Sequence, residues 1–266
     1  MNSLSGSNVH YFYFPIEYCL QNLEDSGFHE MELYLGTPHV FIDRNTVDEF
    51  ADIFSLAKKH HIRISSVHPE TLSFRYTLCH PDPDWNKKSV LAYKRCIKYA
   101  SDNGVPCLRT DIVGAFRDLP QPEILEQVYK NLCDLAVFAK DKNITISLES
   151  TEREYQGFLS DLLSIARLMD ALDKKFPDVF YIGLNWEAVC AMKEDPSEWL
   201  RMFGARLQYV RFENPENLNL IIPWCKESHY CGTLQFYPLE DDTLLSPYIA
   251  DRQVREMAGE AQQKWD

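Results

Sequence analysis

The sequence has no long apolar run and little positive charge, and both absences narrow the range of partners. No stretch approaches the ~20 apolar residues that a membrane-spanning helix needs. The chain carries 27 Lys and Arg against 40 Asp and Glu, a formal net charge of −13. Nucleic acids and anionic membranes bind basic surfaces, so we expect neither as a partner. A small anionic ligand stays open, because a pocket can be locally basic inside an acidic protein.

Paired cysteines and a targeting segment are also lacking. The eight cysteines include no C-x-x-C pair, and several fall on apolar faces, where a free thiol acts as a small hydrophobe. The first residues, MNSLSGSNVHYFYF, lack a cationic stretch followed by a long apolar run. We therefore expect reduced thiols and a cytoplasmic protein.

Short apolar, β-branched or aromatic runs alternate with segments of helical period. The runs are predicted as strands at 11–14, 30–35, 62–67, 105–109, 144–149, 179–185, 207–212 and 232–236. Most are nearly continuous apolar stretches, as expected of parallel strands covered on both faces. Residues 1–10 are small and polar, and they are expected to be flexible.

This alternation of strand and helix has two common solutions, a doubly wound open sheet and a closed barrel. No G-x-G-x-x-G follows any of the runs, which removes the main signature of a dinucleotide-binding sheet. Eight units in 266 residues match the usual size of a (β/α)8 barrel. The sequence therefore predicts an α/β fold, a single TIM barrel domain over residues 1–266.

In such barrels the reactive groups lie at the C-terminal ends of the strands and in the loops that follow. Polar side chains fall at these predicted ends: His68, Arg109, Asp111, Glu149, Asn185, Glu187, Arg211, Glu213 and Tyr237. Glu149 is the first candidate because it ends an apolar run, and a desolvated carboxylate must be paired, metal-bound or protonated. The structural alternative is an ion pair of Glu149 with Arg109 or Arg211. Trp186 is either an apolar wall for a sugar or a packing residue of the outer layer.

Several segments resemble the xylose-isomerase-like barrel superfamily, which includes sugar-phosphate isomerases and epimerases. LEDSGFHEMELYLGTPHVF is similar to the family's first helix and second strand, and AKKHHIRISSVHPE to its second helix and third strand, which ends in His68. AKDKNITISLEST is similar to the fourth helix and fifth strand, which ends in a metal-binding glutamate, here Glu149. SHYCGTLQFY is similar to the turn into the eighth strand. The resemblance implies a TIM barrel that acts on a sugar or sugar phosphate.

The resemblance also implies one divalent metal, held after strands five to eight by Glu, Asp, His and Glu. Here the first position is Glu149, and the others fall on Asn185, Arg211 and, on or near it, Tyr237. Asparagine brings no charge to a hard cation, and arginine cannot bind a metal at all. We therefore expect a degenerate metal site, with Mn, Zn, Co or Mg bound only if the site has moved.

Three hypotheses follow for the rim of the barrel. In the first, an isomerase or epimerase without a metal uses Glu149 as base and Arg211 as electrostatic stabiliser. Its expected substrate contacts are His68, Arg109, Asn185, Trp186, Glu187 and Tyr237. In the second, a relocated metal is bound by Glu149, Glu187, Glu213 and His68. In the third, the barrel has lost catalysis and binds a sugar-like ligand or a partner protein. A homodimer is compatible with the aromatic content of 13%.

Overall fold

Eight parallel strands close into one barrel. The computed structural model describes residues 2–42, 47–114, 121–151, 160–238 and 244–263. The strands are β1 (Leu4–Ser7), β2 (Glu30–Leu35), β3 (Arg63–Pro69), β4 (Cys107–Asp111), β5 (Thr145–Glu149), β6 (Phe180–Asn185), β7 (Leu207–Phe212) and β8 (Thr233–Phe236). Each strand pairs with its neighbour in sequence, and β8 pairs with β1. The fold is therefore a (β/α)8 TIM barrel, as predicted.

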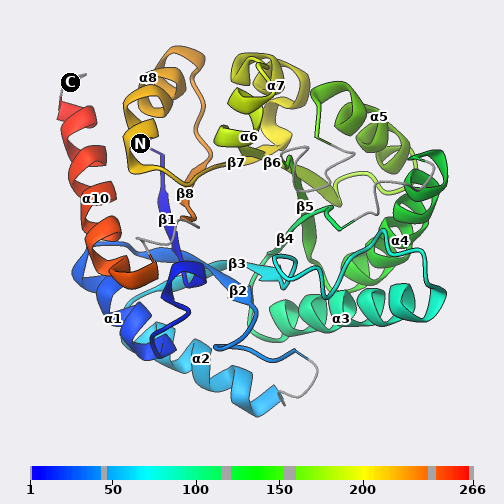
Figure 1. Cartoon of the computed structure of the whole chain (residues 1–266), viewed down its shortest axis with the longest axis horizontal. Helices are drawn as coiled ribbons and strands as arrows, with labels where there is room; N and C mark the ends of the chain where they lie inside the picture. Colours follow the sequence, from blue (N-terminus) through cyan, green and yellow to red (C-terminus); the bar gives the residue numbers. More distant parts are fainter. Residues whose placement is uncertain (1, 43–46, 115–120, 152–159, 239–243, 264–266) are drawn as a thin grey trace.

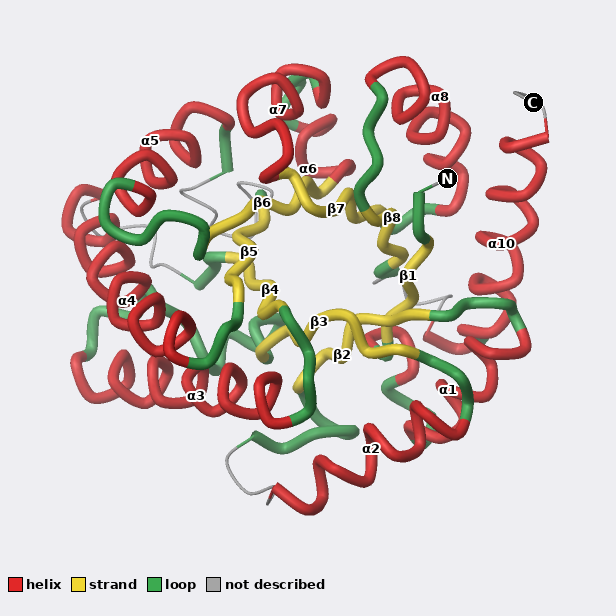
Figure 2. Tube along the Cα trace, turned by 180° about the vertical axis from the view of Figure 1, so that it is seen from behind, coloured by secondary structure: helices red, strands yellow, loops and turns green. Residues whose placement is uncertain are grey.

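Helices form the outer layer of the barrel. They are α1 (Ile16–Asp25), α2 (Val47–Lys59), α3 (Pro83–Asp102), α4 (Gln121–Asp141), α5 (Leu162–Asp173), α6 (Trp186–Ala191), α7 (Pro196–Phe203), α8 (Leu218–Ser228) and α10 (Pro247–Gln263). The last helix, α10, lies between α8 and α1 and completes the ring (Figure 1 and Figure 2). Among the described residues, no helix is long and apolar enough to cross a membrane.

The helices begin and end where local chemistry favours it. α3 starts at Pro83, whose fixed φ suits the first helical position, and Asp82 before it accepts a hydrogen bond from the Trp85 N–H. After its last turn comes Gly104, whose φ of 72° is a conformation that glycine adopts without strain. The turn carries the chain directly into the buried strand β4.

The first strand is the one strand that the sequence pattern misplaces. β1 is LSGS, in the segment expected to be flexible, and its Ser5 and Ser7 are fully buried. The prediction of a strand at 11–14 is wrong, because that run follows β1 and starts inside a 3-10 helix, Val9–Tyr11. Space is the physical reason, since a Cβ at Gly6 would lie 2.6 Å from a Leu23 methyl carbon. Small residues fit this strand, where the pattern of apolar runs favours large ones.

The barrel has an apolar outer layer and a polar interior. Strand residues that face the helices are apolar and buried: Leu33, Val67, Leu108, Ile146, Ile182 and Val210. The alternate residues are polar or charged and equally buried: Glu32, Ser66, Arg109, Ser147, Glu149, Arg211 and Gln235. Most TIM barrels fill this interior with branched apolar side chains. Charges in such a place must be paired, so the interior of this barrel is built from hydrogen bonds and ion pairs.

Candidate active site

A cavity of about 210 Å³ opens at the C-terminal ends of the strands. Its lining residues are Thr71, Leu72, Phe74, Asp111, Val113, Glu149, Thr151, Asn185, Arg211 and Glu213. Four of them end or nearly end strands, and the register pairs Asp111 with Glu149 and Asn185 with Arg211. Because neighbouring parallel strands lie about 4.8 Å apart, these side chains enter the cavity as one continuous polar wall.

Glu149 and Arg211 form a buried ion pair in this wall. Nη1 of Arg211 donates to Oε1 of Glu149 at 2.5 Å, and the Tyr209 hydroxyl donates to Oε2 at 2.9 Å. The guanidinium carbon of Arg211 lies 3.5 Å from the centre of the Tyr237 ring. The aromatic face fixes the plane of the guanidinium, and the guanidinium in turn orients the carboxylate.

Burial raises the pKa of Glu149 to about 7. The charge of Arg211 opposes this rise, whereas the nearby carboxylates Asp111 and Glu32 add to it. Burial alone would lower the pKa of Arg211, but Glu149 raises it above its ordinary value, so the guanidinium stays charged. A carboxyl group with a pKa near neutrality can both take and return a proton at physiological pH.

A second ion pair, Arg109 with Glu32, lies one layer deeper in the barrel. Each residue is two positions before a residue of the upper layer, Asp111 on β4 and Tyr34 on β2. Nη1 of Arg109 is 3.5 Å from Oε2 of Glu32 and also donates to the side-chain oxygen of Gln235. Its guanidinium carbon lies 3.8 Å from the centre of the Tyr209 ring. The predicted substrate contact Arg109 is therefore packed beneath Tyr209 and does not line the cavity.

Tyr209, which sequence reasoning missed, connects the two layers. Its ring covers Arg109, and its hydroxyl holds Glu149. The ring can cross the barrel because its register partner on β6 is Gly183, where a Cβ would lie 2.0 Å from Cζ of Tyr209. Strand parity could have identified Tyr209 from the sequence, because it is two residues before Arg211 and therefore faces the same side of the strand.

The other predicted contacts are placed as follows. Asn185 lines the cavity, but its Oδ1 accepts the Ala188 N–H and caps α6. His68 is buried between the rings of Tyr34 and Tyr237, with Nδ1 3.4 Å from the Tyr237 hydroxyl. Burial lowers the pKa of His68, which favours the neutral ring.

Two further predicted contacts, Trp186 and Glu187, have structural partners and are not among the residues that line this cavity. Trp186 packs edge-to-face against Trp224 in the hydrophobic core, at a centroid distance of 5.8 Å. Oε1 of Glu187 accepts hydrogen bonds from the N–H groups of Glu213 and Asn214 and from the Asn217 side chain. Glu187 thereby holds the loop that leads from β7 to α8.

The residues predicted from the sequence to occupy the family's metal positions do not fit a divalent metal. Both oxygens of Glu149 are engaged by Arg211 and Tyr209, and Oδ1 of Asn185 is used as a helix cap. At the predicted third position, Arg211 offers a guanidinium, which carries positive charge and cannot bind a metal. The relocated set is not gathered either: in the described part of the chain, no group of three or more His, Cys, Asp or Glu could hold a metal ion.

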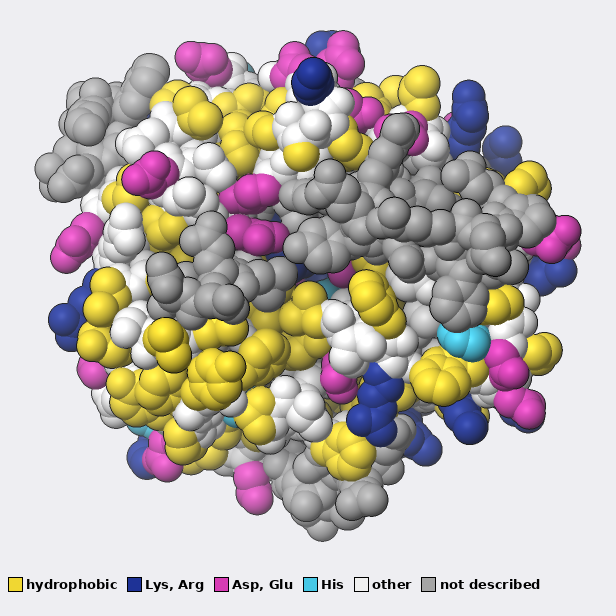
Figure 3. Space-filling view, viewed as in Figure 1, with side chains coloured by type: hydrophobic (Ala, Val, Ile, Leu, Met, Phe, Trp, Pro, Cys, Tyr) yellow, Lys and Arg dark blue, Asp and Glu magenta, His cyan; other side chains and the backbone are white. Residues whose placement is uncertain are grey.

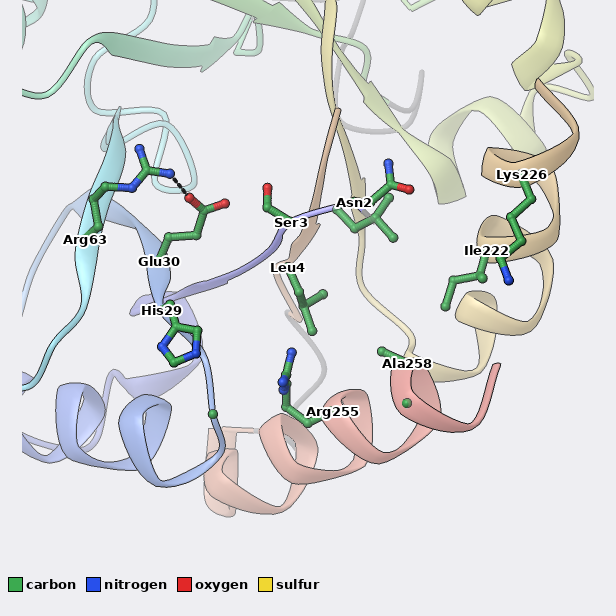
Figure 4. Close-up of a pocket in the computed structure, with 13 residues that line it drawn as sticks. Asn2, Ser3, Leu4, His29, Glu30, Arg63, Ile222, Lys226, Arg255 and Ala258 are labelled. Carbon is green, nitrogen blue, oxygen red and sulfur yellow. Dashed lines mark hydrogen bonds and ion pairs between the residues drawn. The ribbon is translucent and has the colours of Figure 1, made fainter. Parts of the chain in front are cut away.

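A larger cavity, of about 550 Å³, lies at the opposite end of the barrel (Figure 4). Arg63, Lys226 and Arg255 line it from β3, α8 and α10, and Arg63 pairs with Glu30. In Figure 4 these cations stand on different walls and do not point at one centre. The N-terminal end of a TIM barrel serves stability, whereas the chemistry sits at the C-terminal end. We therefore place the candidate active site in the smaller cavity, around Glu149.

Solved structures with this fold cover nearly the whole chain. D-psicose 3-epimerase from Clostridium cellulolyticum H10, with D-tagatose, matches 99% of this chain and 99% of its own, with a TM-score of 0.76 and 13% identity. The 3-keto-D-glucoside 4-epimerase of E. coli matches 99% and 100%, with a TM-score of 0.76 and 12% identity. D-allulose 3-epimerase from Methylomonas sp. matches 99% and 96%, with a TM-score of 0.76 and 15% identity. At such identities the likeness shows the fold alone.

The sequence itself carries the family assignment. No curated protein matches it. A family model, the xylose isomerase-like TIM barrel, matches residues 20–219, which include β2 to β7 and the residues Asp111, Glu149, Asn185 and Arg211. The match covers well over half of the 266 residues. The chain belongs to the xylose isomerase-like TIM barrel family.

Proposed function

We propose that the protein is a sugar or sugar-phosphate isomerase or epimerase that transfers a proton next to a carbonyl group. Glu149 is the base and Arg211 the electrostatic stabiliser. One observation carries the proposal: a buried carboxylate with a pKa of about 7 lines the mouth cavity and is hydrogen-bonded to a permanent cation. General acid–base catalysis favours such a pKa, because it lies near the working pH.

In the proposed reaction, the negative charge stays close to the guanidinium of Arg211 before and after the proton transfer. When Glu149 takes a proton from carbon, the charge moves from the carboxylate to the oxygen of the enediolate that forms. A guanidinium already fixed against the Tyr237 ring needs no rearrangement to follow that charge. In a buried site this preorganised interaction is stronger than it would be in water. Arg211 thus supplies positive charge where other members of the family are expected to hold a metal.

The dimensions of the site favour a small substrate. The cavity of about 210 Å³ is below the roughly 300–1,000 Å³ of pockets for drug-sized ligands. A monosaccharide matches such a space, and the polar wall offers donors and acceptors for its hydroxyl groups. We assign the ring of sugar contacts to Asn185, Arg211 and Glu213, with Leu72 and Phe74 as the apolar side of the cavity.

Exchange of carbon-bound hydrogen tests the proposal. The purified protein is incubated in D2O with a panel of aldoses, ketoses and their phosphates, and deuterium next to the carbonyl is followed by NMR. The wild type is expected to exchange at least one of them, and Glu149→Gln to lose about 10²–10⁴-fold in rate. Asp134→Asn, an exposed carboxylate on α4 paired with Lys94, is the matched control and keeps the wild-type rate.

Absence of exchange by the wild type, together with saturable binding of a sugar in calorimetry, would favour the non-catalytic barrel. One observation keeps that alternative in view: Glu149 has both oxygens engaged within the protein. In that case the Glu149–Arg211 pair acts as structure, and Glu149→Gln would change unfolding without changing binding.

A cytoplasmic location and a homodimer remain predictions. On the face shown in Figure 3, hydrophobic side chains gather over the part of the molecule where Figure 1 places α1 and the start of α10. Exposed apolar residues near these segments are Tyr13, Leu245 and Ile249. Exposed apolar patches often mark contacts between proteins. Light scattering on the purified protein measures the oligomeric state.

A further inference from the structure

Asp111 is a buried carboxylate with one oxygen, Oδ1, that accepts no hydrogen bond from the described residues. It ends β4, is 7% exposed and lines the mouth cavity. Its Oδ1 is buried and has no hydrogen-bond partner among the described residues. Burying a carboxylate oxygen without a partner is unfavourable, so an unpaired one in a cavity calls for an explanation.

The neighbour of Asp111 on β5 is Glu149, its register partner. The two carboxylates line the same cavity from adjacent strands. They differ in what holds them, since Arg211 and Tyr209 engage both oxygens of Glu149 whereas Oδ1 of Asp111 has no hydrogen-bond partner among the described residues. One wall of the cavity thus carries a carboxylate with both oxygens engaged beside a carboxylate with an unpaired oxygen.

A purely structural role for Asp111 is poorly supported. The groups that feel its charge include Glu149, Tyr34 and His68, and none of them is a permanent cation. Arg109, two residues earlier on the same strand, pairs with Glu32 in the layer below. A ligand that donates a hydrogen bond to the unpaired oxygen of Asp111 would satisfy that buried acceptor.

We propose that Asp111 is a second catalytic residue, which carries a proton between two neighbouring oxygens of the substrate in an aldose–ketose isomerisation. This inference rests on the proposed function and adds to Glu149 the second group that the reaction needs. Two carboxylates on adjacent strands reach adjacent atoms on one side of a sugar, which suits transfer between neighbouring carbons and between their oxygens.

The protons balance with these two groups alone. Glu149 takes the hydrogen from the carbon next to the carbonyl, a carbon–carbon double bond forms, and the carbonyl oxygen becomes the enediolate oxygen. Asp111 takes the proton from the neighbouring hydroxyl and gives it to that oxygen. The oxygen that lost its proton becomes the new carbonyl, and the former carbonyl carbon receives the proton from Glu149. Both carboxylates end as they began.

The test separates exchange at carbon from net isomerisation. Aldose–ketose interconversion and deuterium uptake at carbon are measured in D2O on the same samples of wild type, Asp111→Asn and Asp134→Asn. We expect Asp111→Asn to lose about 10²–10⁴-fold in interconversion, the usual contribution of a proton-transfer group, while exchange at carbon falls less than tenfold. Asp134→Asn is expected to match the wild type in both rates. Asp111→Glu, which restores a carboxylate, is expected to recover part of the interconversion.

Each contrary result points to a different failure. An unchanged ratio of interconversion to exchange in Asp111→Asn overturns the role of Asp111 and leaves the proposed function standing. If the wild type converts a ketose into its epimer and forms no aldose, the role of Asp111 is also overturned, because epimerisation needs no proton transfer between oxygens. A wild type without exchange on any sugar overturns both proposals. Thermal unfolding shows whether each variant is folded. If Asp111→Asn is unfolded, the same two rates are measured on Asp111→Ser.

Discussion

The two arginine–glutamate pairs of the barrel interior have the same chemistry and different surroundings. Arg109 and Arg211 are both buried, both pair with a glutamate and both stack on a tyrosine, at 3.8 and 3.5 Å from the ring centres. Only the upper pair, Arg211 with Glu149, lines the cavity. The lower pair is enclosed by Tyr209 and by hydrogen bonds from Arg109 to Gln235 and from Ser66 to Glu32.

The comparison shows that depth along the strand separates structure from chemistry in this barrel. A buried ion pair adds little net stability, but removal of one partner leaves an uncompensated charge. The two pairs lie two residues apart along the strands, which is the distance between successive inward-facing side chains. This difference in depth decides whether the charges of a pair can contact a ligand in the cavity. We therefore expect changes in the lower pair to act on folding and changes in the upper pair to act on catalysis.

The largest effect is expected from Arg109→Met. It leaves Glu32 buried without its cation, which should lower the free energy of unfolding by about 3–5 kcal/mol. Urea-induced unfolding at neutral pH measures the change. The double variant Arg109→Met/Glu32→Gln removes both charges and is expected to recover part of the loss. A folded Arg109→Met protein that is fully stable but inactive would reverse the roles assigned to the two layers.

Arg211→Lys tests the upper pair without leaving Glu149 unpaired. Lysine keeps the positive charge and loses the planar guanidinium that stacks on Tyr237 and donates to Glu149. We expect the exchange rate at carbon to fall about 10²–10³-fold, as when one preorganised donor is removed from a reacting oxygen. Unfolding should change far less than in Arg109→Met. The matched variant Arg109→Lys is expected to show the opposite pattern, and equal effects of the two on both measurements would remove the distinction.

Gly183→Ala tests the residue that joins the layers. A Cβ at this position meets Cζ of Tyr209 at 2.0 Å, so the ring must move away from both Glu149 and Arg109. Such overpacking typically destabilises by about 1–3 kcal/mol. We expect both a lower midpoint of urea unfolding and a slower exchange at carbon. Tyr209→Phe, which keeps the ring and loses only the hydroxyl, should leave the lower layer intact, and full stability of Gly183→Ala would show that Tyr209 can be accommodated elsewhere.

The barrel could be predicted because seven of its strands carry apolar residues on the face toward the helices, and these residues mark the strands in the sequence. β1 could not, since its LSGS sequence fits by small size and has no apolar signal. In the site, the placement of Glu149, Asn185 and Arg211 at one cavity follows from strand ends and parity, while their roles in catalysis stay predictions. The partners of each charge depend on side-chain reach across the barrel. Strand parity alone does not predict that Arg109 pairs with Glu32 or that the Tyr209 hydroxyl donates to Glu149.

The smallest expected effect is the pH dependence of the upper pair. Glu149 acts as a base only when it is ionised, and its pKa is raised to about 7. The rate of exchange at carbon should therefore rise about tenfold between pH 6 and pH 8 and level off above that range. The raised pKa of Glu149 has the opposite effect on stability, because the contribution of this group to stability falls as the pH rises. Because the folded state binds this proton more tightly than the unfolded chain, the contribution of Glu149 is complete below an ordinary carboxyl pKa and is lost as the pH rises through about 7.

Asp111→Asn is the variant that sharpens this last prediction. The charge of Asp111 adds to the effect of burial on the pKa of Glu149, so its removal should move the midpoint of the exchange profile to lower pH. Asp134→Asn, far from the site on the surface of α4, should leave the midpoint where it is. A profile centred near the ordinary pKa of a glutamate in the wild type would mean that Glu149 is solvated in the working protein. The upper pair would then differ from the lower one in hydration as well as in depth, and Glu149 would act as a base without a raised pKa.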